Sequence, residues 1–371
     1  MKILILMTGS YPPKEGIGSH VYSLSKQLVD NGNQVTVVSR RHDLKTIQYI
    51  KDKGINFVLV PIINIPFVST LLFGRYLEKK FKNEVFDVVH YHSPLVPYAN
   101  LNTLRKIVTI HSTMKVDTSF IEAISFNAIL NKIMGKFLSP IIEKKLMMKC
   151  DEIIIVCKEI KDELIKAYHY KNLKTHYIHN GIDKDLFNNL DLTRKKQILY
   201  VGRLGYRKGI PNLLKALKKI QNIIRQNGYS VILCGNGHLF NFCESFIRNN
   251  NLNDIVKLTQ KSQDELNTTY NESKFLIMNS TYETGPRTIL ESIYTNTPFI
   301  ATKVGLIHSI KKEDYIPVED FTVEAVANSI VKAICNIDDN EYEFMKSQIN
   351  KYKDAFDNEK LTNKIIKLYE S

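Results

Sequence analysis

The chain has 371 residues, of which 44% are hydrophobic and 24% are charged, as is typical of a soluble globular protein. Its length exceeds that of one ordinary hydrophobic core, so two domains are expected. It contains no run of about 18 apolar residues, and no transmembrane helix is therefore expected.

The positive charge gathers in the first half of the chain. Residues 1–180 hold 25 Lys/Arg and 15 Asp/Glu, whereas residues 181–371 hold 26 and 23. The first half either faces an anionic partner or uses the charge for solubility. Nucleic acid would fit the charge alone, but no zinc, helix-turn-helix or RNA-binding signature accompanies it, so no nucleic-acid partner is expected.

The cysteines and the first residues indicate a cytoplasmic protein. The five cysteines are widely spaced and form no CxxC pair, which is typical of reduced thiols. The apolar run at 3–7 is short and breaks into Gly, Tyr and Pro, so it predicts a buried strand rather than a signal peptide.

The first half alternates strand-like runs with helical patterns, as parallel α/β units do. Strands are expected at 3–7, 35–38, 57–60, 85–90, 107–111, 152–156 and 177–182, with helices at 19–32, 119–149 and 158–168. Gly16 and Gly18 lie in a turn between the first strand and its helix, where a ligand can approach the backbone closely. His111 ends its strand, and open α/β sheets bind their ligands at that edge.

A turn at 180–183 and a polar stretch at 188–196, interpreted as a linker, separate this series from a second one. Its strands are expected at 198–201, 231–233, 255–258, 275–278 and 315–318, with helices at 211–224 and 263–272 and helical segments after 318. Two such series imply two doubly wound, Rossmann-like α/β domains that face a central cleft.

An acidic loop lies in the segment 274–304, which is predicted to form a strand, a loop, a helix and another strand. Pro286 suits the first turn of the helix; Glu283 precedes it and Glu291 lies in its second turn. The helix start can take a phosphate, and carboxylates accept hydrogen bonds from vicinal hydroxyl groups. This combination fits a nucleotide sugar, although two ordinary surface acids would give the same pattern.

A basic loop follows the strand at 198–201. Arg203 and Lys208 project ahead of a helix that begins near Pro211, where two cations can grip a diphosphate and neutralise it as a leaving group. A solvated loop that carries lysines is the simpler alternative.

With these two loops, the Gly235-Asn236-Gly237 loop and the run PFIAT, the chain resembles the retaining GT-B-type glycosyltransferases of family four (glycosyl transferases group 1). The resemblance covers nearly the whole chain and is most specific in the second half. It implies an acceptor-binding domain at 1–187, a nucleotide-sugar-binding domain at 188–350, and a C-terminal helix within 351–371 that crosses back to the first domain.

The resemblance also implies a role for individual residues. Arg203 and Lys208 would bind the donor diphosphate, Glu283 the donor sugar and Glu291 the ribose hydroxyl groups. Gly16 would lie under the diphosphate, and His111 would touch the sugar near the reacting carbon. The expected catalytic residues are thus Glu283, Lys208, Arg203 and His111. The expected donor-binding residues are Gly16, Gly18, Arg203, Lys208, Gly235, Gly237, Glu283, Gly285, Pro286, Arg287 and Glu291.

The implied reaction is metal-independent transfer of a hexose, with retention, from a UDP- or GDP-sugar to a glycan or lipid-linked acceptor. No metal or other cofactor is expected, because Arg203 and Lys208 supply the positive charge that a metal at Asp183 and Asp185 would provide. The alternatives are a nucleotide-sugar epimerase of the same fold, a non-catalytic nucleotide-sugar-binding protein, and a nucleic-acid binder.

Two segments of the first half combine large apolar residues with lysines. In the segment 119–149 these residues are Phe120, Ile121, Ile124, Phe126, Ile129, Leu130, Ile133, Phe137 and Leu138, beside Lys132, Lys136, Lys144, Lys145 and Lys149. The second segment, 67–75, precedes Lys79, Lys80 and Lys82. Such segments are predicted to bind an anionic membrane surface at the inner face of the cell membrane. Packing against their own sheet is the alternative.

Overall fold

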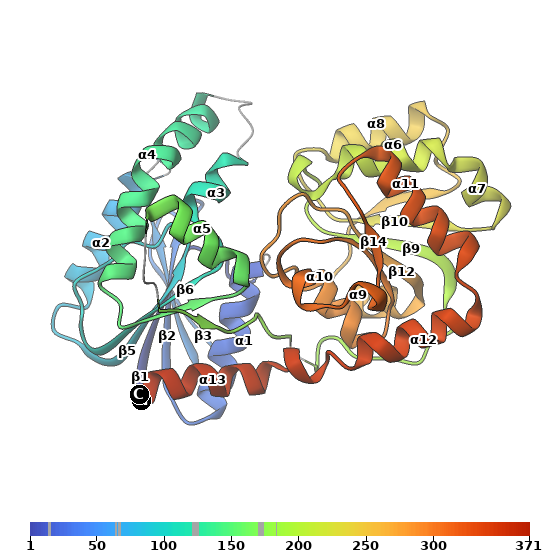
Figure 1. The fold of residues 1–371 in the computed structure, drawn as a ribbon. Helices are drawn as coiled ribbons and strands as arrows, with labels where there is room; N and C mark the ends of the chain where they lie inside the picture. Colours follow the sequence, from blue (N-terminus) through green and yellow to red (C-terminus); the bar gives the residue numbers. More distant parts are fainter. Residues whose placement is uncertain (14–15, 64, 66–67, 121–125, 170–173, 183) are drawn as a thin grey trace. The chain divides into compact units, whose positions relative to one another are not determined.

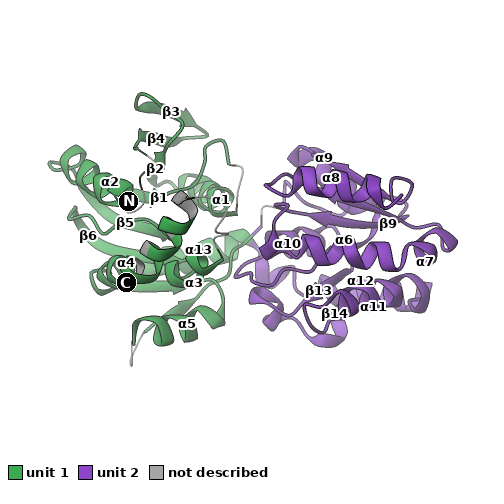
Figure 2. Cartoon of the chain, turned by 90° about the horizontal axis from the view of Figure 1, so that it is seen from above, with its two compact units in different colours: residues 1–181, 358–371 green, residues 182–357 purple. Residues whose placement is uncertain are grey.

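The computed structural model describes the chain except residues 14–15, 64, 66–67, 121–125, 170–173 and 183. Two units form: residues 1–181 with 358–371 make unit 1, and residues 182–357 make unit 2 (Figure 2). Each unit has its own mainly parallel sheet with flanking helices, so the expected class of two Rossmann-like α/β domains is confirmed (Figure 1). The chain passes between the units after Gly181 and after Asp357, whereas the sequence placed the boundaries after residues 187 and 350.

Unit 1 contains an eight-stranded sheet in the order β3-β4-β2-β1-β5-β6-β7-β8. Its strands are β1 Lys2–Met7, β2 Gln34–Arg41, β3 Gln48–Asp52, β4 Ile55–Pro61, β5 Val85–Ser93, β6 Asn102–Ile110, β7 Glu152–Ile155 and β8 His176–Tyr177. All neighbours are parallel except β3 and β4. The sequence did not predict β3, because this edge strand is largely exposed and lacks an alternating apolar pattern.

The helices of unit 1 are α1 Gly16–Asp30, α2 Val68–Lys80, α3 Met114–Ser119, α4 Phe126–Met148, α5 Lys158–Tyr168 and α13 Asn358–Glu370. The helix predicted at 158–168 is confirmed in α5. The long helical region predicted at 119–149 corresponds to α4 and the last residue of α3.

The strands of unit 1 are buried on both faces, which is why they read as continuous apolar runs. Successive side chains of a strand point to opposite faces. Accordingly, Ile3 and Ile5 pack with α1 and α13, whereas Leu4 and Leu6 pack with α2.

The C-terminal helix α13 belongs to unit 1 and closes one of its apolar clusters with Leu361, Ile365 and Tyr369. The Tyr369 hydroxyl group lies 2.7 Å from Nδ1 of His90, whose Nε2 lies 2.8 Å from the Thr109 hydroxyl group. Buried polar groups need such partners. These bonds therefore couple α13 to strands β5 and β6.

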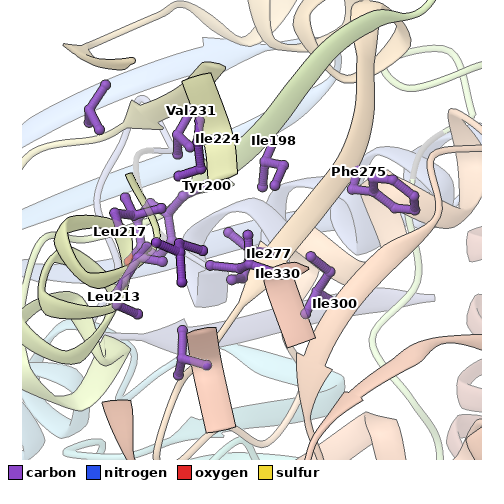
Figure 3. Packing of buried hydrophobic residues seen from close by; sticks show 14 of the residues in the cluster. Ile198, Tyr200, Leu213, Leu217, Ile224, Val231, Phe275, Ile277, Ile300 and Ile330 are labelled. Atoms are coloured by element: carbon purple, nitrogen blue, oxygen red, sulfur yellow. The ribbon is translucent and has the colours of Figure 1, made fainter. Parts of the chain in front are cut away.

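Unit 2 contains a six-stranded, fully parallel sheet in the order β11-β10-β9-β12-β13-β14. Its strands are β9 Lys195–Val201, β10 Ser230–Cys234, β11 Val256–Thr259, β12 Ser273–Met278, β13 Phe299–Thr302 and β14 Ile316–Val318. Its α-helices are α6 Ile210–Lys219, α7 Gln221–Gln226, α8 Phe240–Asn249, α9 Gln263–Glu272, α10 Arg287–Tyr294, α11 Val323–Val331 and α12 Asp339–Asn350. Figure 3 shows residues of its larger core cluster, in which Leu213 and Leu217 of α6 pack with Ile277 and Ile330.

The stretch at 188–196 is part of unit 2 rather than a free linker, so that interpretation is wrong. The Arg194 guanidinium donates five hydrogen bonds: to the carbonyl groups of Tyr270, Ser273, Thr295 and Asn296 and to the Thr297 hydroxyl group. One side chain thus joins the ends of α9 and α10 to the start of β9. A local polar pattern cannot reveal partners 76 or more residues away.

Replacing Arg194 with Met should lower the free energy of unfolding of unit 2 by about 3 kcal/mol, because several carbonyl groups lose their donor. Urea unfolding measures this change. The matched control is Lys195→Met, which removes a neighbouring surface ion pair with Glu272 and should cost less than about 1 kcal/mol. Equal losses in the two variants would contradict the assigned role of Arg194.

The buried His90 should make the stability of unit 1 depend on pH. Burial lowers the pKa of His90 to about 3, so the fold holds this imidazole neutral while the unfolded chain protonates it at its ordinary value. The contribution is complete above the unfolded pKa of about 6.5 and is lost as pH falls toward 3; at pH 5 the loss is about 2 kcal/mol.

Urea unfolding at pH 7 and pH 5 tests this expectation. His90→Gln should show a smaller loss on acidification than the unaltered chain, whereas the exposed control His42→Gln should not. Burial raises the pKa of Glu143 to about 7, so this carboxyl group makes the folded state more stable as pH falls from 7 to 5, opposite to the effect of His90. The comparison between variants separates the two effects. An unchanged pH dependence in His90→Gln would contradict the expectation.

Candidate functional site

The carboxyl edge of the unit 2 sheet carries two loops that meet backbone to backbone. Gly202 follows β9 and Gly235 follows β10, and a Cβ atom on Gly235 would lie 1.9 Å from the Gly202 carbonyl oxygen. A Cβ atom on Gly237 would lie 2.3 Å from the Leu204 carbonyl oxygen, and the Leu204 amide donates to the Asn236 carbonyl group at 2.9 Å. The predicted Gly235 and Gly237 are therefore needed for loop packing, whatever ligand they contact.

Lys208 ends a short 3-10 helix, Tyr206–Lys208, which Gly209 terminates with a φ of +72°. A Cβ atom on Gly209 would lie 2.2 Å from the Asn279 carbonyl oxygen, and the Asn279 amide group donates to the Gly209 carbonyl group at 2.8 Å. Asn279 directly follows β12. The loop that carries Lys208 is thus fixed to the segment that leads to Glu283.

The Glu283 loop is held from both sides. The Thr281 amide donates to the Arg207 carbonyl group at 2.9 Å, and the Leu306 amide donates to the Thr284 carbonyl group at 3.0 Å. Gly305 has a φ of +53°, and a Cβ atom there would lie 2.4 Å from the Glu283 carbonyl oxygen. The backbone of Glu283 therefore has little freedom to move.

Lys208 and Glu283 form an ion pair through Nζ and Oε1, and their side chains are only 25% and 11% exposed. The sequence analysis predicted both as site residues but assigned Lys208 to the diphosphate of the donor and Glu283 to its sugar. It did not predict that they pair. The structure brings together a cation and a carboxylate in a partly desolvated position, where their attraction is stronger than in water.

Glu291 is buried in α10, where it accepts a hydrogen bond of 2.8 Å from the Tyr270 hydroxyl group. Arg287 Nε lies 3.7 Å from the other carboxylate oxygen, and burial raises the pKa of Glu291. Pro286 was expected in the first turn of this helix. The helix begins one residue later, at Arg287, and Pro286 is its N-cap. Gly285, just before it, is partly exposed.

Arg203 is exposed in the loop after β9, and the Tyr200 hydroxyl group holds its carbonyl group at 3.0 Å. No carboxylate of a described residue lies within 4.0 Å of its guanidinium group. Arg203 is therefore available to an anion. Sequence reasoning missed Tyr270 and Asn279, since neither has a local signal.

In unit 1, Gly18 packs against the loop after β1, and its Cβ atom would lie 3.1 Å from the Ser10 carbonyl oxygen. Gly16 is exposed at the first residue of α1, and a Cβ atom there would meet no described atom within 4 Å. The helix thus begins three residues before the predicted position at 19. Close packing accounts for Gly18 but not for Gly16.

His111 follows β6 directly, rather than ending the strand, and lies in a cluster of imidazoles that the sequence did not predict. Its Nε2 lies 2.9 Å from Nδ1 of His92, and the His20 ring lies 5.1 Å away between centroids. Burial holds the pKa of His111 and His92 well below the usual value, so both imidazoles are neutral. Among the described residues, this is the only group of three His, Cys, Asp or Glu side chains close enough to hold a metal ion. Asp183, where the sequence analysis expected no metal, lies outside the described residues.

Comparisons with known proteins cover both halves of the chain. The family described as Glycosyltransferase Family 4 matches residues 14–186, and Glycosyl transferases group 1 matches residues 182–352. An uncharacterized glycosyltransferase from Methanocaldococcus jannaschii is 26% identical over 85% of this chain and 83% of its own length.

Solved structures share the fold. Sucrose-phosphate synthase from Thermosynechococcus elongatus matches with a TM-score of 0.82 at 20% identity, over 100% of this chain and 98% of the other. Anabaena HepE, solved with UDP and glucose, matches with a TM-score of 0.72 at 15% identity, over 100% and 99%. With both of its halves matched, the chain belongs to the group 1 glycosyltransferases of GT-B fold and is a transferase of the EC 2.4 type.

Proposed function

We propose that the chain transfers a hexose from a UDP- or GDP-sugar to a sugar or lipid-linked acceptor, with retention of configuration and without a metal. The donor would bind unit 2 and the acceptor unit 1. The observation that carries the proposal is the Lys208–Glu283 ion pair at the carboxyl edge of the unit 2 sheet, in the same unit as the exposed Arg203. The solved complex of HepE with UDP and glucose supports a uridine nucleotide.

The ion pair is compatible with a diphosphate site in the absence of its ligand. Without donor, Lys208 and Glu283 neutralise each other. A diphosphate would attract Lys208 and Arg203, leaving the Glu283 carboxylate to accept hydrogen bonds from sugar hydroxyl groups. The two cations would then stabilise the negative charge that develops on the departing diphosphate. In this role they would take the place of a metal ion. The oxygen of the acceptor hydroxyl group would form the new bond to the sugar while the leaving phosphate receives its proton, so no separate general base is required.

Glu291 suits the ribose end of the donor. The Tyr270 hydroxyl group and Arg287 hold one carboxylate oxygen each, so the orientation of the carboxylate is set before a ligand arrives. For His111 we propose a hydrogen bond with a sugar hydroxyl group, which a neutral imidazole can donate or accept.

We further propose that α4 binds an anionic membrane surface. Ile129, Ile133, Phe137 and Ile141 recur every four residues, and all are exposed. The lysines at 132, 136, 144 and 145 are also exposed, whereas Leu146 and Met147 anchor the end of the helix in the core. An exposed apolar stripe beside lysines is what an anionic lipid interface recognises.

The rest of the two predicted segments gives a mixed picture. In α2, Phe73 and Leu77 are buried in the core, which favours packing against the sheet for that segment. Ile121, Ile124 and Phe67 lie outside the described residues. None of the described helices has the length and apolar character to span a bilayer. We propose peripheral binding through the exposed apolar stripe and lysines of α4.

Lys208→Ala and Arg203→Ala should each lower turnover about 10²–10³-fold, as the loss of one preorganised charge typically does. Donor hydrolysis and transfer, followed by product analysis, measure the effect. The control is Lys215→Ala, an exposed lysine of α6. Near-normal turnover in both single variants would refute the proposed role of Arg203 and Lys208. If a chelator abolished the activity of the unaltered chain and magnesium restored it, the proposed metal independence would be wrong.

The unaltered chain should sediment with vesicles that contain anionic lipid, and binding should weaken as ionic strength rises from about 0.05 to about 0.5 M, because the Debye length shrinks. Replacing the four exposed α4 lysines at 132, 136, 144 and 145 with Gln should reduce binding. A control on unit 2 with the same charge change replaces Lys215, Lys218, Lys311 and Lys332, all of them exposed. If the unaltered chain stays in the supernatant at low ionic strength, the membrane proposal is wrong.

A further inference from the structure

Arg40 is a buried cation close to the carboxyl edge of the unit 1 sheet. It is the last residue but one of β2 and is 6% exposed. Its Nη1 atom donates to the Ser69 hydroxyl group at 3.2 Å and to the Thr70 hydroxyl group at 2.9 Å. Both hydroxyl groups are buried in the first turn of α2. Its neighbours on β2 bond to the loop after β1, Ser39 to the Gly9 carbonyl group and Arg41 to the Tyr11 carbonyl group.

Arg40 has no counter-charge. No carboxylate of a described residue lies within 4.0 Å of its guanidinium group, whereas the next residue, Arg41, pairs with Asp43. Burial lowers the pKa of Arg40 to about 10, and no nearby acid raises it. A buried guanidinium group is costly unless an anion compensates it, and two neutral hydroxyl groups do so only in part.

The start of α2 increases this cost. The positive end of a helix dipole repels a cation and attracts an anion. Nε and Nη2 of Arg40 form no hydrogen bond with any residue that the structure describes. A buried charge and a positive helix end are both unfavourable in the free chain, whereas Nε and Nη2 are not among the fully buried atoms without a partner and so keep contact with solvent. An oxyanion at this position would compensate the charge and the helix end and could accept hydrogen bonds from the two donors, since a guanidinium fork matches the oxygens of a phosphate.

We propose that Arg40, with the hydroxyl groups of Ser69 and Thr70, forms a binding site for a phosphate group. The proposal rests on the proposed function only in naming the acceptor as the molecule that carries this phosphate. A purely structural role, in which Arg40 clamps β2 onto α2, is the competing explanation.

Thermal unfolding with inorganic phosphate, at constant ionic strength, separates the two explanations. The parent is the full chain with Arg203→Ala and Lys208→Ala, which removes the proposed diphosphate site as a source of binding. Phosphate should raise the melting temperature of this parent and of the control Arg75→Gln, an exposed arginine of α2, but not of Arg40→Gln. Without phosphate, Arg40→Gln should melt at the same or a higher temperature than the parent, because an uncompensated buried charge is gone.

A lower melting temperature of Arg40→Gln together with an undiminished phosphate response would overturn the proposal in favour of the clamp. Ser69→Ala keeps the guanidinium group and gives a second readout if Arg40→Gln does not fold. It should raise the phosphate Kd about tenfold, which corresponds to about 1.4 kcal/mol. An unchanged Kd there would also count against the site.

Two further measurements identify the source of the phosphate. Glycerol 3-phosphate represents a soluble ester, and pelleting with phosphatidic acid vesicles represents a lipid. Dependence on Arg40 in either measurement supports the site, and independence in both overturns it. Donor hydrolysis by the unaltered chain is measured in parallel. Its absence would refute the proposed function while the phosphate response of Arg40 still stood.

Discussion

The carboxyl edge of the unit 2 sheet depends on backbone contacts that leave no room for a Cβ atom. Gly235 meets the Gly202 carbonyl group, Gly209 meets that of Asn279, and Gly305 meets that of Glu283. Each contact fixes one loop against the next. Side chains at these positions would push the loops apart, and shifts on the scale of 1 Å matter greatly for groups that position a substrate.

The two units handle buried charge differently. Among the residues that the structure describes, unit 2 pairs two of its partly or fully buried cations with acids, Lys208 with Glu283 and Arg287 with Glu291, and leaves only the exposed Arg203 of its candidate site without one. Unit 1 instead buries neutral imidazoles and leaves Arg40 without an acid. The guanidinium group of Arg40 therefore bonds only to neutral hydroxyl groups among the described residues of unit 1.

The sequence predicted the elements whose apolar pattern is regular and local. Helices α5 and α9 have the predicted bounds. Both parallel sheets follow from the alternation of strand-like runs with helical patterns along the chain. What it could not predict depends on residues far apart in the chain. Lys208 and Glu283 are 75 residues apart. Arg194 lies in a polar stretch of the sequence, and only the fold brings its hydrogen-bond acceptors near it. Charges along a loop predicted which residues to consider, but not which of them pair.

Helix α13 makes unit 1 discontinuous, and this has a consequence for the order of folding. His90 and Tyr369 are 279 residues apart, so closing that loop in an unfolded chain costs about 5 kcal/mol of entropy. Within unit 2, Ile182 pairs with Asp357 in a parallel bridge, next to Gly181 and Asn358. Once unit 2 has folded, the start of α13 is therefore held beside the end of the first segment. During synthesis, the sheet of unit 1 has to wait for the whole of unit 2 before its last helix can cover it.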